Sequence, residues 1–289
     1  MKKDGNQTCK HVHHSHGFLM NTRLDMVLWG VSPETAESIS QDIMAETRKL
    51  QQTLDRFDKD AETCRINHLA LTEETQISPL LMSAVMKSID YFHRTKGYFN
   101  VFAGNAFSSL KNGDVINSFI HLPPEKAVCI GEKRSTIRFL SQEVSLDFGG
   151  IGKGMALDRA AAILGPFKSA NAFISFGGSS ILTRGRHPHG SFWPFSFRDV
   201  QTGEEPWQLN DDAISVSSAT TGKSRHHHIL DPTSGKGVTN NLTTGVQCKH
   251  ATDAEVVSTA LITAPPQWHE EIIAEFDVKK YKIFNTTDR

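Results

Sequence analysis

A glycine-rich turn followed by a lysine is the first place in this sequence where residue types and spacing suit chemistry. A predicted strand ends at Asp147, and Gly149, Gly150 and Gly152 then lead to a predicted helix that begins near Lys153. Glycines let backbone amides approach a ligand, the start of a helix attracts phosphate, and Lys153 would add a positive charge. The turn lacks the first glycine and the Ser or Thr of a Walker A motif. It therefore indicates an anion site or, equally, a tight turn that packs a helix on a sheet.

Two further segments gather side chains that bind metals or move protons. His226, His227 and His228 are consecutive, and in a strand their side chains alternate between faces, so all three cannot bind one metal ion. The simpler interpretation is surface imidazoles with one of them buried. Glu255 and Thr259 are four residues apart, which places their oxygens on one face of a predicted helix. Such an oxygen-only set suits Mg²⁺, although the same pair is common on solvated helices.

Short helices and strands must position these residues. Ser32-Pro33 and Ser78-Pro79 each combine an N-capping serine with a proline at the first helical position, and they predict helices at 33–54 and 79–97. Further helices are predicted at 154–164, 254–263 and 267–276. Apolar runs between turn residues predict strands at 21–31, 115–122, 127–130, 136–140, 144–148, 172–176, 195–198, 214–217 and 246–248. Because these elements show no regular βαβ alternation, the predicted fold class is α+β.

The composition excludes several classes of protein. The 289 residues include 31 basic and 32 acidic side chains, whereas a nucleic-acid-binding protein normally has a basic surplus. No apolar run approaches the roughly 20 residues of a membrane span. The four cysteines form no CxxC pair, so we expect free thiols in a reducing compartment. Polar residues follow Lys2 and Lys3 where a signal peptide would be apolar, and we therefore expect a cytoplasmic protein.

Six segments, in this order along the chain, together resemble the ApbE family, the flavin transferases that move FMN from FAD onto a protein threonine. They are MNT at 20–22, LDRFDKDAETCRIN at 54–67, GYFNVFAG at 97–104, LDFGGIGKGMALDRAAAIL at 146–164, HHILDPTSG at 227–235 and EVVSTAL at 255–261. The fourth segment is the most specific. The resemblance implies an α+β, T-fold-related mixed sheet packed with helices, in a single compact domain with two lobes. We expect this domain to span residues 18–289 and to follow a flexible arm, residues 1–17, which is polar and holds four of the 14 histidines.

The resemblance also implies roles for individual residues. The implied FAD contacts are Met20, Phe57, Tyr98, Phe99, Asn100, Asp147, Lys153 and His228. The implied Mg²⁺ ligands are the Glu255 carboxylate, the Thr259 hydroxyl and the Gly150 carbonyl. His228 and Lys153 would be catalytic, with His228 activating the acceptor hydroxyl, because an imidazole is a suitable base near neutral pH. The partner would be an acceptor protein that offers a threonine or serine.

The sequence departs from the family pattern at four positions. Asn100 and Glu255 stand where the family has aspartate, and Asn21 and Ala219 stand where it has glycine. Many family members are exported lipoproteins, but Cys9 lacks the apolar run of a lipobox. Two alternatives to a transferase therefore stay open: an FAD pyrophosphatase that releases FMN and AMP, and a non-catalytic FAD-binding protein.

Overall fold

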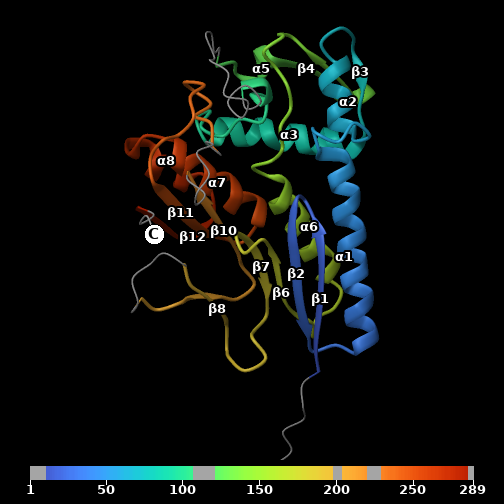
Figure 1. Ribbon diagram of the computed structural model, residues 1–289, viewed down its shortest axis with the longest axis vertical. Coiled ribbons are helices and arrows are strands. Elements are labelled where there is room, and N and C mark those ends of the chain that lie inside the picture. The colour runs from blue at the N-terminus through green and yellow to red at the C-terminus, as the bar shows by residue number, and fades with distance from the viewer. Residues whose placement is uncertain (1–10, 107–120, 198–203, 220–228, 286–289) are drawn as a thin grey trace, which may run out of the picture.

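The computed structural model describes residues 11–106, 121–197, 204–219 and 229–285, and they form an α+β fold around one large antiparallel sheet (Figure 1). The strand order is β1-β2-β6-β7-β10-β11-β12. The strands of this sheet are β1 (Val12–Leu19), β2 (Thr22–Trp29), β6 (Asn171–Phe176), β7 (Ser180–Arg184), β10 (Ala213–Ser218), β11 (Leu242–Cys248) and β12 (Val278–Asn285). All its described strand pairs are antiparallel. The predicted fold class is confirmed.

Three helices cover one face of this sheet: α1 (Pro33–Leu54), α6 (Gly152–Leu164) and α7 (Ala251–Thr263). Helix α6 packs against both α1 and α7, and α7 also packs on β10 and β11. On the other face, β8 (Trp193–Phe195) pairs with β9 (Trp207–Leu209). The two tryptophans of this hairpin pack with Trp29, Ile181 and Ile214 of the sheet. Burial on both faces makes the sheet a rigid support for the residues at its ends.

A smaller lobe lies at the top of the view in Figure 1. It contains α2 (Glu62–Leu69), α3 (Pro79–Arg94), α5 (Pro124–Ala127) and the sheet β3 (Thr75–Gln76), β5 (Thr136–Phe139) and β4 (Val128–Gly131). Below it, η2 (Pro266–Trp268) and α8 (His269–Ala274) follow α7. One hydrophobic core runs through both lobes, from Leu24 and Ile174 of the large sheet to Leu81 and Ile137 of the smaller lobe. The described residues therefore form one domain with two lobes.

The serines predicted to cap the two long helices make the expected hydrogen bonds. The Ser32 hydroxyl accepts a hydrogen bond from Thr35 N at 3.2 Å, and the Ser78 hydroxyl accepts one from Leu81 N at 3.1 Å. Each serine therefore satisfies an amide that has no partner within its helix, and the proline that follows already has a helical φ. Both predicted helices are confirmed, with α3 ending at Arg94 rather than Gly97.

Several boundaries differ from the prediction. Residues 12–17 are not part of a flexible arm, because they belong to β1 and pair with β2. The sequence hid this strand because β1 is an edge strand with exposed histidines on one face. Residues 144–148 form no strand and make only an isolated bridge, Ala103 with Ser145. The strand predicted at 195–198 lies instead at Trp193–Phe195. Most of the strand predicted at 115–122 lies outside the described residues.

The described part of the chain also bears on two expectations from composition. None of its helices is long and apolar enough to cross a membrane. Cys64, Cys129 and Cys248 are free thiols.

Candidate functional site

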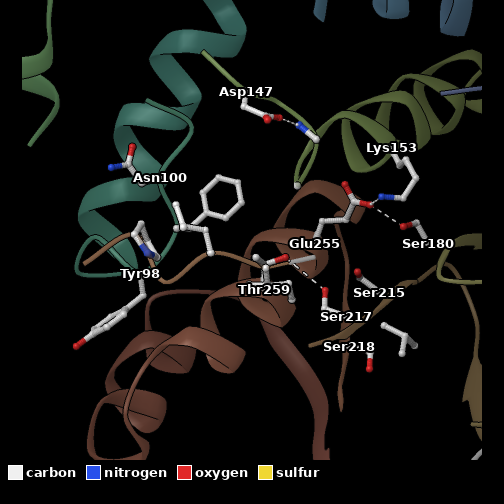
Figure 2. Close-up of a pocket in the computed structure, with 17 residues that line it drawn as sticks. Tyr98, Asn100, Asp147, Lys153, Ser180, Ser215, Ser217, Ser218, Glu255 and Thr259 are labelled. Carbon is white, nitrogen blue, oxygen red and sulfur yellow. Dashed lines mark hydrogen bonds and ion pairs between the residues drawn. The ribbon is translucent and has the colours of Figure 1, made fainter. Parts of the chain in front are cut away.

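A cavity of about 320 Å³ opens between the two lobes, where the glycine turn, β10 and α7 meet (Figure 2). Eight of the residues to which the resemblance gave a role line it. They are Tyr98, Phe99, Asn100, Asp147, Gly150, Lys153, Glu255 and Thr259. These residues span more than 160 positions of the chain. Folding therefore brings together segments that are far apart in the sequence and that only the family resemblance had assigned to one site.

The segment before the glycine turn is held by hydrogen bonds from two places, the Asn67 side chain and the Val101 backbone. The Asn67 side chain donates to Leu146 O at 3.0 Å and accepts from Leu146 N at 2.7 Å. Asp147 N donates to Val101 O at 2.8 Å. An amide side chain that both donates and accepts replaces a neighbouring strand. This explains how residues 144–148 stay extended without belonging to a sheet.

Asp147 shapes the turn itself. Its Oδ1 accepts a hydrogen bond from Gly149 N at 2.8 Å, and its Oδ2 lies 3.1 Å from Nη1 of Arg56. The Arg56 and Asp147 side chains are only 10% and 14% exposed, so water screens this ion pair weakly. Arg56 was not among the residues for which the resemblance implied a role.

A second pocket of about 130 Å³ adjoins the first and shares Asp147, Gly149 and Lys153 with it. Met20 and Phe57 line this smaller pocket, so the expected FAD contacts are divided between the two pockets. The Phe57 ring is 63% exposed, although aromatic side chains are mostly buried. An exposed ring beside a pocket is suited to stacking on a planar ligand.

The hairpin turn that carries Met20 has an unusual backbone. Leu19 pairs with Thr22, so Met20 and Asn21 form a two-residue loop, and their φ angles are 54° and 56°. Two positive φ values match the twist of a tight hairpin, and asparagine tolerates them better than other residues with a side chain. Asn21 can therefore replace the glycine of the family pattern. Met20 N donates to Oε1 of Gln51 at 2.8 Å, which anchors the strained turn to α1.

Glu255 is buried in the cavity wall and has three partners. Its Oε1 lies 2.8 Å from Nζ of Lys153 and accepts a hydrogen bond from the Ser180 hydroxyl at 2.6 Å. Its Oε2 accepts a bond from Gly154 N at 2.8 Å. Figure 2 shows Lys153 and Ser180 meeting at this carboxylate. These contacts compensate the cost of burying a carboxylate that is 3% exposed.

Hydroxyl groups line the side of the cavity next to Glu255. Ser215 and Ser217 alternate along β10 and face α7, where Ser217 Oγ lies 3.3 Å from the Thr259 hydroxyl. Ser218 also lines the cavity. The prediction that Glu255 and Thr259 share a helical face is confirmed, since both line this cavity. The sequence assigned these serines no role, although their alternation in SVSS was a visible signal.

The surroundings differ among three consecutive cavity residues that follow α3, namely Tyr98, Phe99 and Asn100. Asn100 Oδ1 accepts a hydrogen bond from Phe102 N at 2.8 Å, a role that the family's aspartate could also fill. Phe99 is largely buried, and its ring packs against Gly150. Burial, and then the negative charge of Asp231, raises the pKa of the Tyr98 hydroxyl. Of these three, Phe99 therefore offers a ligand the least surface.

Other residues of the specific motif at 146–164 support the site without lining it. The Asp158 carboxylate accepts hydrogen bonds from Ala251 N at 2.8 Å and Thr252 N at 3.1 Å, and so caps α7. A Cβ on Gly154 would lie 2.7 Å from Thr252 Cα, so only glycine allows α6 and α7 to approach this closely. These two contacts fix α7, and with it Glu255, against the glycine turn.

The donors available to a metal ion are oxygens. The described residues contain no group of three His, Cys, Asp or Glu side chains placed to hold one. Glu255 is the carboxylate that α7 presents to the cavity, next to the Thr259 hydroxyl and the glycine turn. Of its four lone pairs, the described contacts use three, which leaves one on Oε2. This set suits a cation that keeps water or phosphate ligands, as Mg²⁺ does. His228 lies outside the described residues.

Known proteins resemble this chain in sequence and in fold. The ApbE family model matches residues 20–281. The FAD:protein FMN transferase of Chlamydia trachomatis serovar D is 25% identical over 252 residues, which cover 81% of this chain and 78% of that protein. The ApbE protein of Thermotoga maritima MSB8 has a TM-score of 0.76 at 19% identity, covering 96% of this chain and 97% of its own. For the flavin transferase ApbE of Vibrio cholerae the TM-score is 0.75 at 19% identity, with 96% and 98% covered. Since the family model spans most of the sequence, the chain belongs to the ApbE family.

Proposed function

We propose that this protein transfers FMN from FAD to the hydroxyl of a threonine or serine in an acceptor protein, with release of AMP. The observation that carries the proposal is the pair of adjoining pockets that meet at Asp147, Gly149 and Lys153. A dinucleotide has two ring systems joined by a diphosphate. The flavin would stack on Phe57 in the smaller pocket, the diphosphate would lie at the glycine turn, and the adenosine half would enter the larger cavity.

The residues of the site suit phosphoryl transfer, which depends mainly on positioning and on neutralising charge. The acceptor oxygen would attack the phosphorus of the FMN half and form a new P–O bond. The bond between that phosphorus and the bridging oxygen would break, and AMP would leave with the electron pair. Lys153 lines both pockets and would offset negative charge on the diphosphate. The hydroxyl proton needs a base, for which His228 stays a prediction from the sequence.

We further propose that Glu255, Thr259 and the Gly150 carbonyl hold Mg²⁺. When bound, the ion would neutralise the diphosphate charge. The chemistry of the donors supports this choice, because carboxylate, hydroxyl and carbonyl oxygens are all hard ligands. Glu255 would then serve both the ion and Lys153, whose Nζ lies 2.8 Å from Oε1. The methylene that glutamate adds to the family's aspartate gives the carboxylate the reach to contact Ser180 as well.

The direct test is incubation of the purified protein with FAD and Mg²⁺, followed by chromatography of the nucleotides. A transferase releases AMP and leaves covalent flavin on an added threonine-containing acceptor, which mass spectrometry detects. Free FMN with AMP in equal amounts would identify a pyrophosphatase instead. Binding of FAD without AMP would identify a non-catalytic flavin-binding protein. A chelator should abolish AMP release, and added Mg²⁺ should restore it.

Two lysine variants distinguish the effect of losing Lys153 at the site from the effect of losing any positive charge on the protein. Lys153→Met should lose AMP release, because it removes the cation shared by the two pockets. Lys168→Met is the control, because Lys168 is exposed and lines neither pocket. Equal activity of the two variants would contradict the assignment of the glycine turn as the diphosphate site.

A further inference from the structure

Arg56 and Asp147 form an ion pair beside the proposed diphosphate site. Asp147 lines both pockets, and Oδ1 of its carboxylate fixes the glycine turn through Gly149 N at 2.8 Å. A negative charge at this place repels an anionic ligand. The shape of the glycine turn therefore depends on the Asp147 carboxylate, whereas binding of an anionic ligand requires a positive group that offsets the charge of this carboxylate.

Arg56 is built into the position that cancels this charge. Its Nη1 donates to Asp147 Oδ2 at 3.1 Å and to Gly104 O at 2.6 Å. The guanidinium packs directly on Gly104, because a Cβ built there would overlap Nη1 and would lie 2.7 Å from Ser145 O. With 10% of its side chain exposed, Arg56 is fixed in place before any ligand binds. A pre-placed charge needs no reorganisation during binding.

Arg56 also connects the turn to the exposed aromatic ring. Its guanidinium carbon lies 5.4 Å from the centroid of the Phe57 ring, within the range of a cation–π contact. One side chain thus contacts the carboxylate beside the proposed diphosphate site and the ring beside the proposed flavin site. A lysine ammonium is a point charge without the planar guanidinium that stacks on a ring.

We propose that Arg56 is a positioning residue that neutralises Asp147 and so allows the glycine turn to accept the diphosphate of FAD. The proposal rests on the proposed function, in which FAD is the substrate. It assigns a role to a residue for which the resemblance implied none, and it makes binding of the charged part of the ligand depend on an ion pair that acts through Asp147.

The test compares a charged with an uncharged flavin. FAD and riboflavin share the ring system, and only FAD carries the diphosphate. Arg56→Gln should weaken FAD binding roughly tenfold or more, since it leaves an uncompensated carboxylate beside the ligand. Riboflavin lacks the diphosphate, so its binding should lose only what the contact of Arg56 with the Phe57 ring contributes, a smaller loss than that of FAD. Quenching of flavin fluorescence measures both affinities, and far-UV circular dichroism with thermal unfolding checks the fold.

Rescue by a second substitution separates neutralisation from direct contact. If Arg56 acts through Asp147, Arg56→Gln combined with Asp147→Asn should recover most of the lost FAD affinity. The asparagine Oδ1 can still accept the bond from Gly149 N. Arg134→Gln is the matched control, because Arg134 pairs with Glu74 at 2.8 Å on the exposed surface of the smaller lobe and should not alter FAD affinity.

Each other outcome refutes a defined part of the proposal. An equal loss of FAD and riboflavin binding would mean that Arg56 only shapes the pocket. A loss of FAD binding without rescue by the double variant would mean that Arg56 binds the phosphates directly. If the wild type fails to bind FAD, the proposed function is wrong. Binding of inorganic pyrophosphate then tests the role of the Arg56–Asp147 ion pair without a flavin. Weaker pyrophosphate binding by Arg56→Gln than by the wild type supports the neutralising role, and unchanged or undetectable binding overturns it.

Discussion

Glu255→Gln is the most direct test of the contacts at the centre of the site. The glutamine keeps the size of the side chain, and its carbonyl can still accept the bond from Gly154 N. Its amide hydrogens, however, would face Lys153 Nζ, which lies 2.8 Å from the present Oε1. The substitution therefore replaces an ion pair with an unfavourable contact between two donors, while the backbone around it stays in place.

The expected loss of stability follows from the burial of the two partners. Breaking a fully buried ion pair by removing one charge costs roughly 3–5 kcal/mol. The Lys153 side chain is 24% exposed against 4% for Glu255, so water compensates part of the loss on the lysine side. A hydrogen bond to a charged group contributes about 1.5–3 kcal/mol, and we therefore expect a decrease of about 2 kcal/mol in the free energy of unfolding. For a chain of this size, that lowers Tm by roughly 4–8 °C.

Urea and thermal unfolding measure this loss, and AMP release from FAD measures the function in the same preparations. Glu255→Gln should retain a native circular dichroism spectrum and lose AMP release, with partial recovery in excess Mg²⁺. Glu255→Asp restores the family residue and should match or exceed the wild type in AMP release. The combination with Lys153→Met closes a double-mutant cycle, in which the two substitutions should be less than additive by about 1 kcal/mol or more.

Two results would refute the reasoning. A free energy of unfolding within about 0.5 kcal/mol of the wild type would place the change in the range of ordinary surface substitutions, contrary to the contacts described for Glu255. Full AMP release by Glu255→Gln, or wild-type turnover that is indifferent to a chelator, would exclude the proposed Mg²⁺ site.

Three further predictions concern the supports of the site. Gly154→Ala should lower the free energy of unfolding by about 1–3 kcal/mol in urea titrations, because its Cβ would lie 2.7 Å from the backbone at the start of α7. Glu62→Ala should cost about 1–3 kcal/mol in the same assay, because Glu62 accepts bonds from Ser78 N at 2.7 Å and Ser78 Oγ at 2.6 Å. Burial raises the pKa of the Cys248 thiol, so at pH 8 it stays protonated and should react with a thiol reagent only on unfolding, whereas the exposed Cys129 reacts in the native state.

Each of these predictions has its own control. Gly190→Ala adds a Cβ that meets its nearest neighbour at 3.5 Å and should be close to neutral, so an equal loss would refute the packing argument for Gly154. Glu62→Gln keeps an acceptor and should lose less stability than Glu62→Ala. Rapid modification of Cys248 in the native protein, followed by mass spectrometry of its peptide, would contradict its burial.

The sequence predicted the residues that line the cavity better than it predicted the boundaries of the strands. Residues in ordered motifs, such as Asp147, Lys153 and Glu255, were found because the family pattern preserves their order. The sequence assigned no role to Arg56 or Ser180, because their contacts at the site join residues more than 70 positions apart in sequence. Residue type alone does not show which distant partner a side chain will meet.

The sequence by itself determined the class of fold, the two proline-initiated helices and the place of the glycine turn before α6, because these depend on local backbone preferences and capping. Tertiary structure alone decided that residues 12–17 form an edge strand and that residues 144–148 remain extended outside any sheet. It also decided that Glu255 is buried against Lys153. These features depend on hydrogen bonds and ion pairs between distant segments, and such contacts form only when the core has packed the segments together.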